Sequence, residues 1–102
     1  MSLQDIIAKA RKKQVTTQEL VEEVIRCYHR QDKSGLYALD EAINFGITHQ
    51  SILQTKKPLQ ALHELHLKRK LVLAQAQEII PDKNGLKNFY AAVTGYRGID
   101  IE

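Results

Sequence analysis

The sequence predicts an all-α fold: one compact bundle of five or six helices around a long central helix at about residues 58–80. Three observations predict this fold. The central stretch contains no Gly or Pro after Pro58 and consists mostly of strong helix formers. Apolar residues recur along it at intervals of three and four, as they do on the buried face of a helix. This stripe consists of Leu59, Leu62, Leu65, Val72, Ala76 and Ile79, and it is widened by Leu67, Leu71, Leu73 and Ile80. No segment keeps the two-residue alternation of a strand for long enough to predict a sheet.

Proline marks both limits of the central helix. Pro58 suits the first helical position, where its missing N–H costs nothing, and Pro81 follows the last turn. The whole chain has 102 residues, which suits a single helical domain over residues 1–102 with a modest core. Within that domain, residues 96–102 are expected to form a loose C-terminal tail.

Shorter helices are predicted on either side. Ser2 can cap a first helix, and Thr16 with Glu19 forms a capping box at the start of a second. The second helix should end at residues 32–35, where turn formers gather. A third helix is predicted from Leu36 to Gly46, because glycine readily adopts the left-handed conformation that ends helices.

Two further helices complete the prediction. Thr48 is a suitable cap for a short fourth helix, which leads toward the central one. After a turn at residues 82–85, the last helix is predicted from Leu86 to Thr94, with Gly95 as its end.

Composition narrows the class of protein. Hydrophobic residues make up 43% of the chain and charged residues 26%, and the formal net charge is +3. A single cysteine, Cys27, excludes an intrachain disulfide. We find neither a signal-peptide pattern nor an apolar run of membrane-spanning length, and therefore expect a cytoplasmic protein without a transmembrane segment.

The sequence offers little support for an enzyme. His63 and His66 stand three residues apart, but a metal site needs further ligands. Phosphate-binding glycine loops and nucleophile elbows are missing from the sequence. Neighbouring carboxylates such as Glu22 and Glu23 diverge on a helix. We therefore expect no catalytic activity, no metal site and no cofactor.

One spacing suggests nucleic-acid binding. Ala42, Gly46 and Ile52 have the spacing of a helix-turn-helix, in which Gly permits the turn between two crossing helices. Residues 39–57 accordingly resemble the helix-turn-helix DNA-binding proteins, and the resemblance implies duplex DNA as the partner. It implies that the second helix enters the major groove and contacts bases through Thr48, His49, Gln50 and Gln54. It also implies that the phosphates are held by Lys56, Lys57, Lys68, Arg69 and Lys70.

The alternative is a helical bundle that works by binding a protein. In length, charge and helical pattern the chain is similar to bacteriocin immunity proteins and to small adaptor proteins built on four-helix-like bundles. Tyr96 and Arg97 are residue types favoured at interfaces and are the candidate contact residues. The wide apolar stripe of the central helix could be covered within the chain or by a second copy in a homodimer.

Arg69 interrupts that apolar stripe. The periodicity between Leu65 and Val72 expects a buried residue at its position. Either the bundle opens there, or Arg69 meets a carboxylate or an anionic partner.

Overall fold

Residues 2–53 and 58–96 are described by the computed structural model, with the backbone alone at residues 50–53 and 58. They form five helices: α1 (Leu3–Arg11), α2 (Thr17–Arg30), α3 (Lys33–Leu53), α4 (Pro58–Ile79) and α5 (Lys83–Thr94). No strand occurs among these residues. The predicted all-α bundle with a long helix that begins at Pro58 is therefore confirmed.

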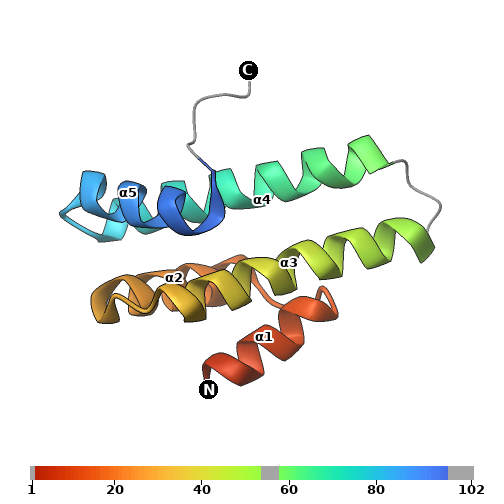
Figure 1. Ribbon diagram of the computed structural model, residues 1–102, viewed down its shortest axis with the longest axis horizontal. Coiled ribbons are helices and arrows are strands. Elements are labelled where there is room, and N and C mark those ends of the chain that lie inside the picture. Colours follow the sequence, from red (N-terminus) through yellow and green to blue (C-terminus); the bar gives the residue numbers. More distant parts are fainter. Residues whose placement is uncertain (1, 54–57, 97–102) are drawn as a thin grey trace.

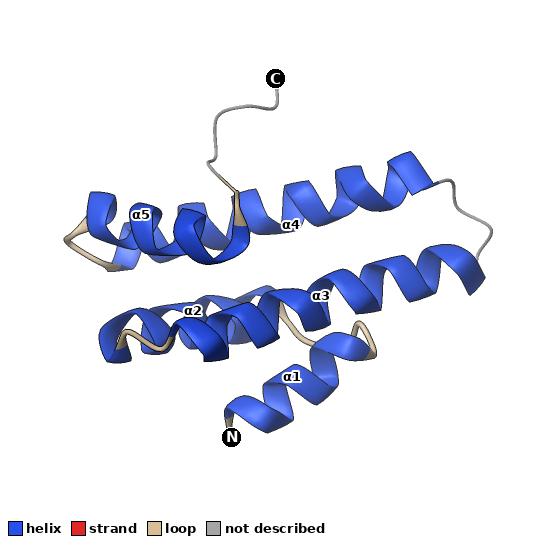
Figure 2. Ribbon diagram, viewed as in Figure 1, coloured by secondary structure: helices blue, strands red, loops and turns tan. Residues whose placement is uncertain are grey.

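The helices lie in layers (Figure 1). α4 and α5 run side by side in one layer over α2 and α3, and α1 packs on the other side of α3. α3 contacts all four other helices, and α4 contacts α2, α3 and α5. Short loops join α1 to α2, α2 to α3 and α4 to α5 (Figure 2).

Local side-chain chemistry sets most helix ends. The predicted capping box is present at α2, where the Glu19 N–H donates to Thr16 Oγ1 over 3.1 Å and Glu19 bonds back to the Thr16 N–H. α1 has the same arrangement between Ser2 and Asp5. α2 ends at Arg30 and is capped by Gln31, whose φ of +54° is left-handed. The Asp32 carboxylate then accepts a hydrogen bond from the Gly35 N–H. Residues 32–35, which were predicted to end α2, therefore form the N-terminal cap and first turn of α3.

The predicted turn at Gly46 is wrong, because α3 continues through it to Leu53. Gly46 is buried against α1, where a Cβ atom would lie 2.3 Å from the carbonyl oxygen of Ala10. The glycine therefore permits a close crossing of two helices and does not end one. Residues from Thr48 onward continue α3 and do not begin a separate helix. The described chain thus has no helix-turn-helix at this position.

The core lies between the two layers and under α1. Its completely buried side chains come from α2, α3, α4 and α5, and the largest are Tyr90, Leu20, Leu36, Leu39, Leu86 and Val72. α1 adds Ile6 and Ala10, each 2% exposed. Within the ranges given above, none of the helices is both long enough and apolar enough to cross a membrane.

Candidate protein-interaction surface

Arg69 meets a carboxylate inside the bundle. Its Nε and Nη2 donate to Oδ1 and Oδ2 of Asp40 on α3, over 3.0 and 2.5 Å. Burial alone would lower the pKa of Arg69, but the hydrogen bonds and the charge of Asp40 hold it above its ordinary value. Asp40 is only 6% exposed, so this bidentate pair links α3 to α4 at a half-buried position. The interruption of the apolar stripe is explained by a partner within the chain.

The other predicted DNA contacts are scattered over α3 and α4. Lys68 Nζ donates to Thr17 Oγ1 over 3.3 Å, and Lys70 is exposed. Thr48 bonds to Asn44, and the ring of His49 stacks on that of Phe45. The Gln50 side chain, Gln54, Lys56 and Lys57 lie outside the described residues, and so does Arg97, a candidate contact of the protein-binding alternative.

Tyr96, a candidate partner contact, is buried at the end of the bundle. It is 5% exposed, and its ring centroid lies 4.8 Å from that of His66 and 6.3 Å from that of Tyr90. Its backbone N–H donates to Thr94 Oγ1 over 3.1 Å. Tyr96 thus closes the space between α5 and α4 in the form described, and little of it is available to a partner.

α4 carries, between Leu59 and Leu71, exposed leucines that the sequence placed in its apolar stripe. Leu59 is 79% exposed and Leu62 is 62% exposed, while Leu67 and Leu71 are 50% and 44% exposed. Exposed single leucines are common, but four on one stretch of thirteen residues are a feature of this surface.

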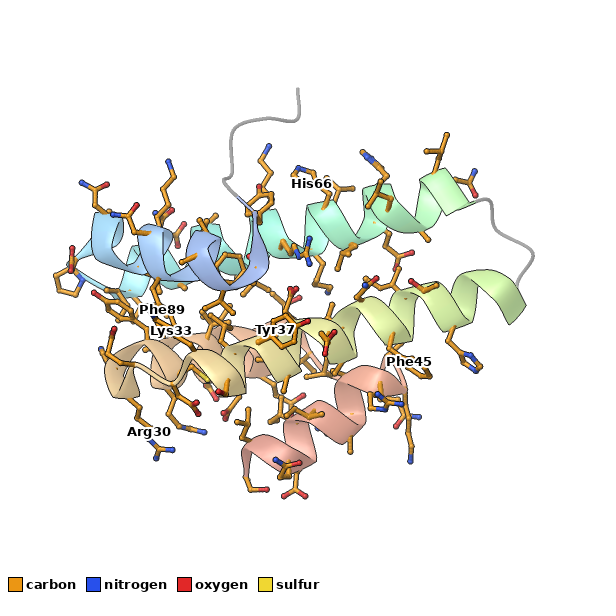
Figure 3. All side chains as sticks on the ribbon, in the orientation of Figure 1. Arg30, Lys33, Tyr37, Phe45, His66 and Phe89 are labelled. Carbon is orange, nitrogen blue, oxygen red and sulfur yellow. The ribbon has the colours of Figure 1, made fainter. Side chains whose placement is uncertain are left out.

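A shallow groove of about 390 Å³ runs along this part of α4. We name it the α4 groove, and its lining residues are Leu59, Leu62, His63, His66 and Arg69. Figure 3 labels His66 on α4, close to where the described chain leaves α5. α5 and Tyr96 lie beside α4 from His66 onward, whereas the leucines of the groove precede that point (Figure 1). The groove is therefore the part of the α4 flank that α5 leaves open.

A second exposed cluster, which sequence reasoning missed, joins α1 to α3. The guanidinium carbon of Arg11 lies 4.1 Å from the centroid of the Phe45 ring, and His49 stacks on the same ring at 5.5 Å. Phe45 is 43% exposed and lies on α3 near the end of α1 (Figure 3). Because the Arg11–Phe45 contact holds α1 against α3, the cluster is accounted for by packing between these helices.

Across residues 2–53 and 58–96, no three His, Cys, Asp or Glu residues lie close enough to hold a metal ion. Burial raises the pKa of the Cys27 thiol to about 11, so little reactive thiolate exists at neutral pH. The absence of catalysis remains a prediction, and so do the cytoplasmic location and the homodimer.

When the sequence is compared with models of known protein families, it matches one family. The model of the Ras association (RalGDS/AF-6) domain matches residues 12–78, about two-thirds of the chain, which include the whole α4 groove. No curated protein and no solved structure matches the chain, so the family follows from sequence and not from a shared fold. The match contradicts the resemblance to helix-turn-helix DNA-binding proteins and removes the support for duplex DNA as a partner. The chain belongs to the Ras association (RalGDS/AF-6) domain family, a family of protein-interaction domains.

Proposed function

We propose that this chain is a non-catalytic interaction module that binds a GTPase of the Ras class through the α4 groove. The family supports a protein partner of that class. The observation that carries the choice of surface is the exposure of Leu59 and Leu62 inside the matched region. Exposed apolar side chains gathered at one place on a surface mark sites of interaction with other proteins.

The groove combines an apolar floor with a polar edge. Two leucines supply the area that a partner can remove from water, and full burial of a leucine contributes about 1.5–3 kcal/mol. Because Leu59 and Leu62 are 79% and 62% exposed, each retains more than half of its side-chain area for such a contact. The imidazoles of His63 and His66 and the paired Arg69 can supply hydrogen bonds that orient the partner.

Leu62→Asp tests the surface in the complete chain. It places a charge in the groove at a position already 62% exposed, so the fold should be retained while partner binding weakens at least tenfold. Leu67→Asp is the matched control, because Leu67 is also exposed on α4 but does not line the groove. It should change the affinity by less than about twofold.

The measurement is a calorimetric titration with purified Ras, carried out separately with the GDP-bound protein and with one bound to a non-hydrolysable GTP analogue. Binding of the unchanged chain in either state, and its selective loss in Leu62→Asp, would support the proposal. The proposal fails if the unchanged chain binds neither form. An equal loss in both leucine variants would rule out the groove as the contact surface.

A further inference from the structure

A second cavity lies between α4 and α5, farther along α4 than the α4 groove. Its volume is about 200 Å³, and we name it the α4–α5 cavity. Positions 70, 73, 74 and 77 of α4 line it from one face of that helix, because they are spaced by about one helical turn. Lys87 on α5 and Tyr96 after it complete the lining, where the two helices run side by side (Figure 1). The cavity shares no lining residue with the α4 groove.

The walls of this cavity are held by contacts within the chain. Gln77 Nε2 donates to the carbonyl oxygen of Lys83 over 3.2 Å, and Lys83 Nζ donates to the carbonyl oxygen of Gln77. These two bonds join α4 to the first turn of α5. The ring of Tyr96 is held by its contacts with the rings of His66 and Tyr90. Because the walls are fixed before anything binds, a ligand would lose little free energy in ordering them.

Two ammonium groups border the cavity without a counter-charge. Lys70 is exposed and Lys87 is half-buried. Within residues 2–53 and 58–96 neither amine makes an ion pair or a hydrogen bond, and no carboxylate lines the cavity. Glu78 follows Gln77 on α4, but the helix turns by about 100° per residue, and Glu78 does not line the cavity. The charges at the rim therefore favour an anion.

The bottom of the cavity is apolar. Leu73 and Tyr96 are 4% and 5% exposed, and Ala74 is exposed beside them. The aliphatic stem of each lysine adds apolar surface below its ammonium group. A volume of about 200 Å³ is below the range of about 300–1,000 Å³ that is typical for drug-sized ligands, so the ligand must be small. It must also combine an apolar body with an anionic group.

We propose that the α4–α5 cavity binds a small organic phosphate monoester. Its phosphate contacts Lys70 and Lys87, and its apolar body lies over Leu73 and Tyr96. A phosphate monoester carries about 1.5–2 negative charges at pH 7, which match two ammonium groups better than a single carboxylate does. Lysine binds phosphate as a point charge and does not need the planar geometry of arginine. The site involves neither the α4 groove nor a GTPase, so its test is independent of the proposed function.

Phenyl phosphate is the probe for this site. It is titrated into the complete chain at constant ionic strength and followed by nuclear magnetic resonance of the backbone amides. The resonances of Ala74, Gln77 and Lys87 should move and reach saturation, because these residues line the cavity. Phenyl phosphate should bind at least about fivefold more tightly than inorganic phosphate, which has no apolar body. Benzoate has the apolar body but only one charge, and it should also bind more weakly than phenyl phosphate.

Glutamine substitutions test the two lysines. Lys70→Gln and Lys87→Gln each remove one charge from the rim and should weaken phenyl phosphate binding at least about fivefold. Lys12→Gln is the matched control, since it removes the same charge at an exposed position after α1, on the other side of α3 from the cavity (Figure 1). It should change the affinity by less than about twofold. The absence of saturable shifts, or an equal loss of affinity in all three variants, would overturn the site. Equal affinities for phenyl phosphate and either of the other two anions would overturn the assignment of its ligand.

Discussion

The two ends of the α3–α4 pair differ in how much the rest of the chain covers them. At one end, α2 and α5 pack against the first half of α3 and the second half of α4 (Figure 1). There Val72, Leu73 and Ala76 are at most 4% exposed. α1 lies along α3 from Gly35 to Gly46, and at the other end of the pair Leu59 and Leu62 on α4 are largely exposed. We refer to them as the covered end and the open end.

This contrast separates stability from recognition along a single helix. Both ends of α4 carry apolar residues at helical spacing. This spacing is the same whether the apolar face is buried by another helix of the chain or by a partner protein. Burial within the chain at the covered end stabilises the fold. Exposed apolar area at the open end contributes nothing comparable until something binds there.

Leucine truncations should separate the two ends most strongly. Leu73→Ala at the covered end should lower the free energy of unfolding by about 3–4 kcal/mol, because it removes buried area and leaves a cavity. Leu62→Ala at the open end makes the same chemical change and should cost less than about 0.5 kcal/mol. Urea denaturation of both variants measures the difference. Similar losses in the two variants would contradict the division between the ends.

The Asp40–Arg69 pair lies at the boundary of the two ends and should show the next largest effect. Asp40→Ala leaves the Arg69 guanidinium, whose side chain is 20% exposed, without its carboxylate. We expect a loss of about 2–3 kcal/mol, somewhat below the value for a completely buried pair because Arg69 keeps contact with water. Asp40→Leu combined with Arg69→Met is the control, since replacing both charges by apolar groups should restore most of the stability. A double variant as unstable as Asp40→Ala would contradict this account.

Gly46→Ala tests the packing of α1 on α3 toward the open end. Alanine is the better helix former by about 1 kcal/mol, but its Cβ atom would meet the backbone of Ala10. Because that contact involves backbone, α1 must move, and we expect a net loss of about 1 kcal/mol or more. The exposed Asn44 lies on the same helix, and Asn44→Ala should be neutral or slightly stabilising. Thermal unfolding followed by circular dichroism compares the two, and a more stable Gly46→Ala protein would disprove the steric role of the glycine.

Local chemistry made much of the fold predictable from the sequence. The Thr16–Glu19 capping box and the start of α4 at Pro58 depend on neighbouring residues only, and both were predicted correctly. The role of Gly46 depends on Ala10, which is 36 positions away in the sequence. A turn and a close helix crossing both need a residue without a side chain, so the local pattern could not distinguish them.

The site was less predictable for a related reason. Arg69 was recognised as anomalous in the stripe, but its partner Asp40 is 29 positions away, and several other carboxylates were equally available in the sequence. Leu59 and Leu62 were identified as part of an apolar stripe. Their exposure follows from where α5 and Tyr96 meet α4, which is a tertiary property. The periodicity gives the apolar face of a helix but not what covers it.

The smallest expected effect is a loss of stability at low pH, to which two carboxyl groups, Asp82 and Glu19, contribute. At the covered end, the Gly85 N–H and the Tyr28 hydroxyl donate to Asp82 and lower its pKa. On the α1 side, Lys9 is the main cause of the lowered pKa of Glu19. A carboxyl group whose pKa is lower in the folded state stabilises the fold above its unfolded pKa, and this contribution is lost as the pH falls through the folded value.

We therefore expect the thermal midpoint to fall as the pH decreases below about 4, the ordinary range of carboxyl groups. Asp82→Asn and Glu19→Gln should each reduce this dependence, because the amide cannot be protonated in that range, although both also lower the midpoint at neutral pH. Asp82 is exposed and the Glu19 side chain keeps 23% of its surface in contact with solvent, so the changes should be smaller than those of the three substitutions above. Melting curves at a series of pH values test this, and a pH dependence that neither variant reduces would assign the acid response to other groups.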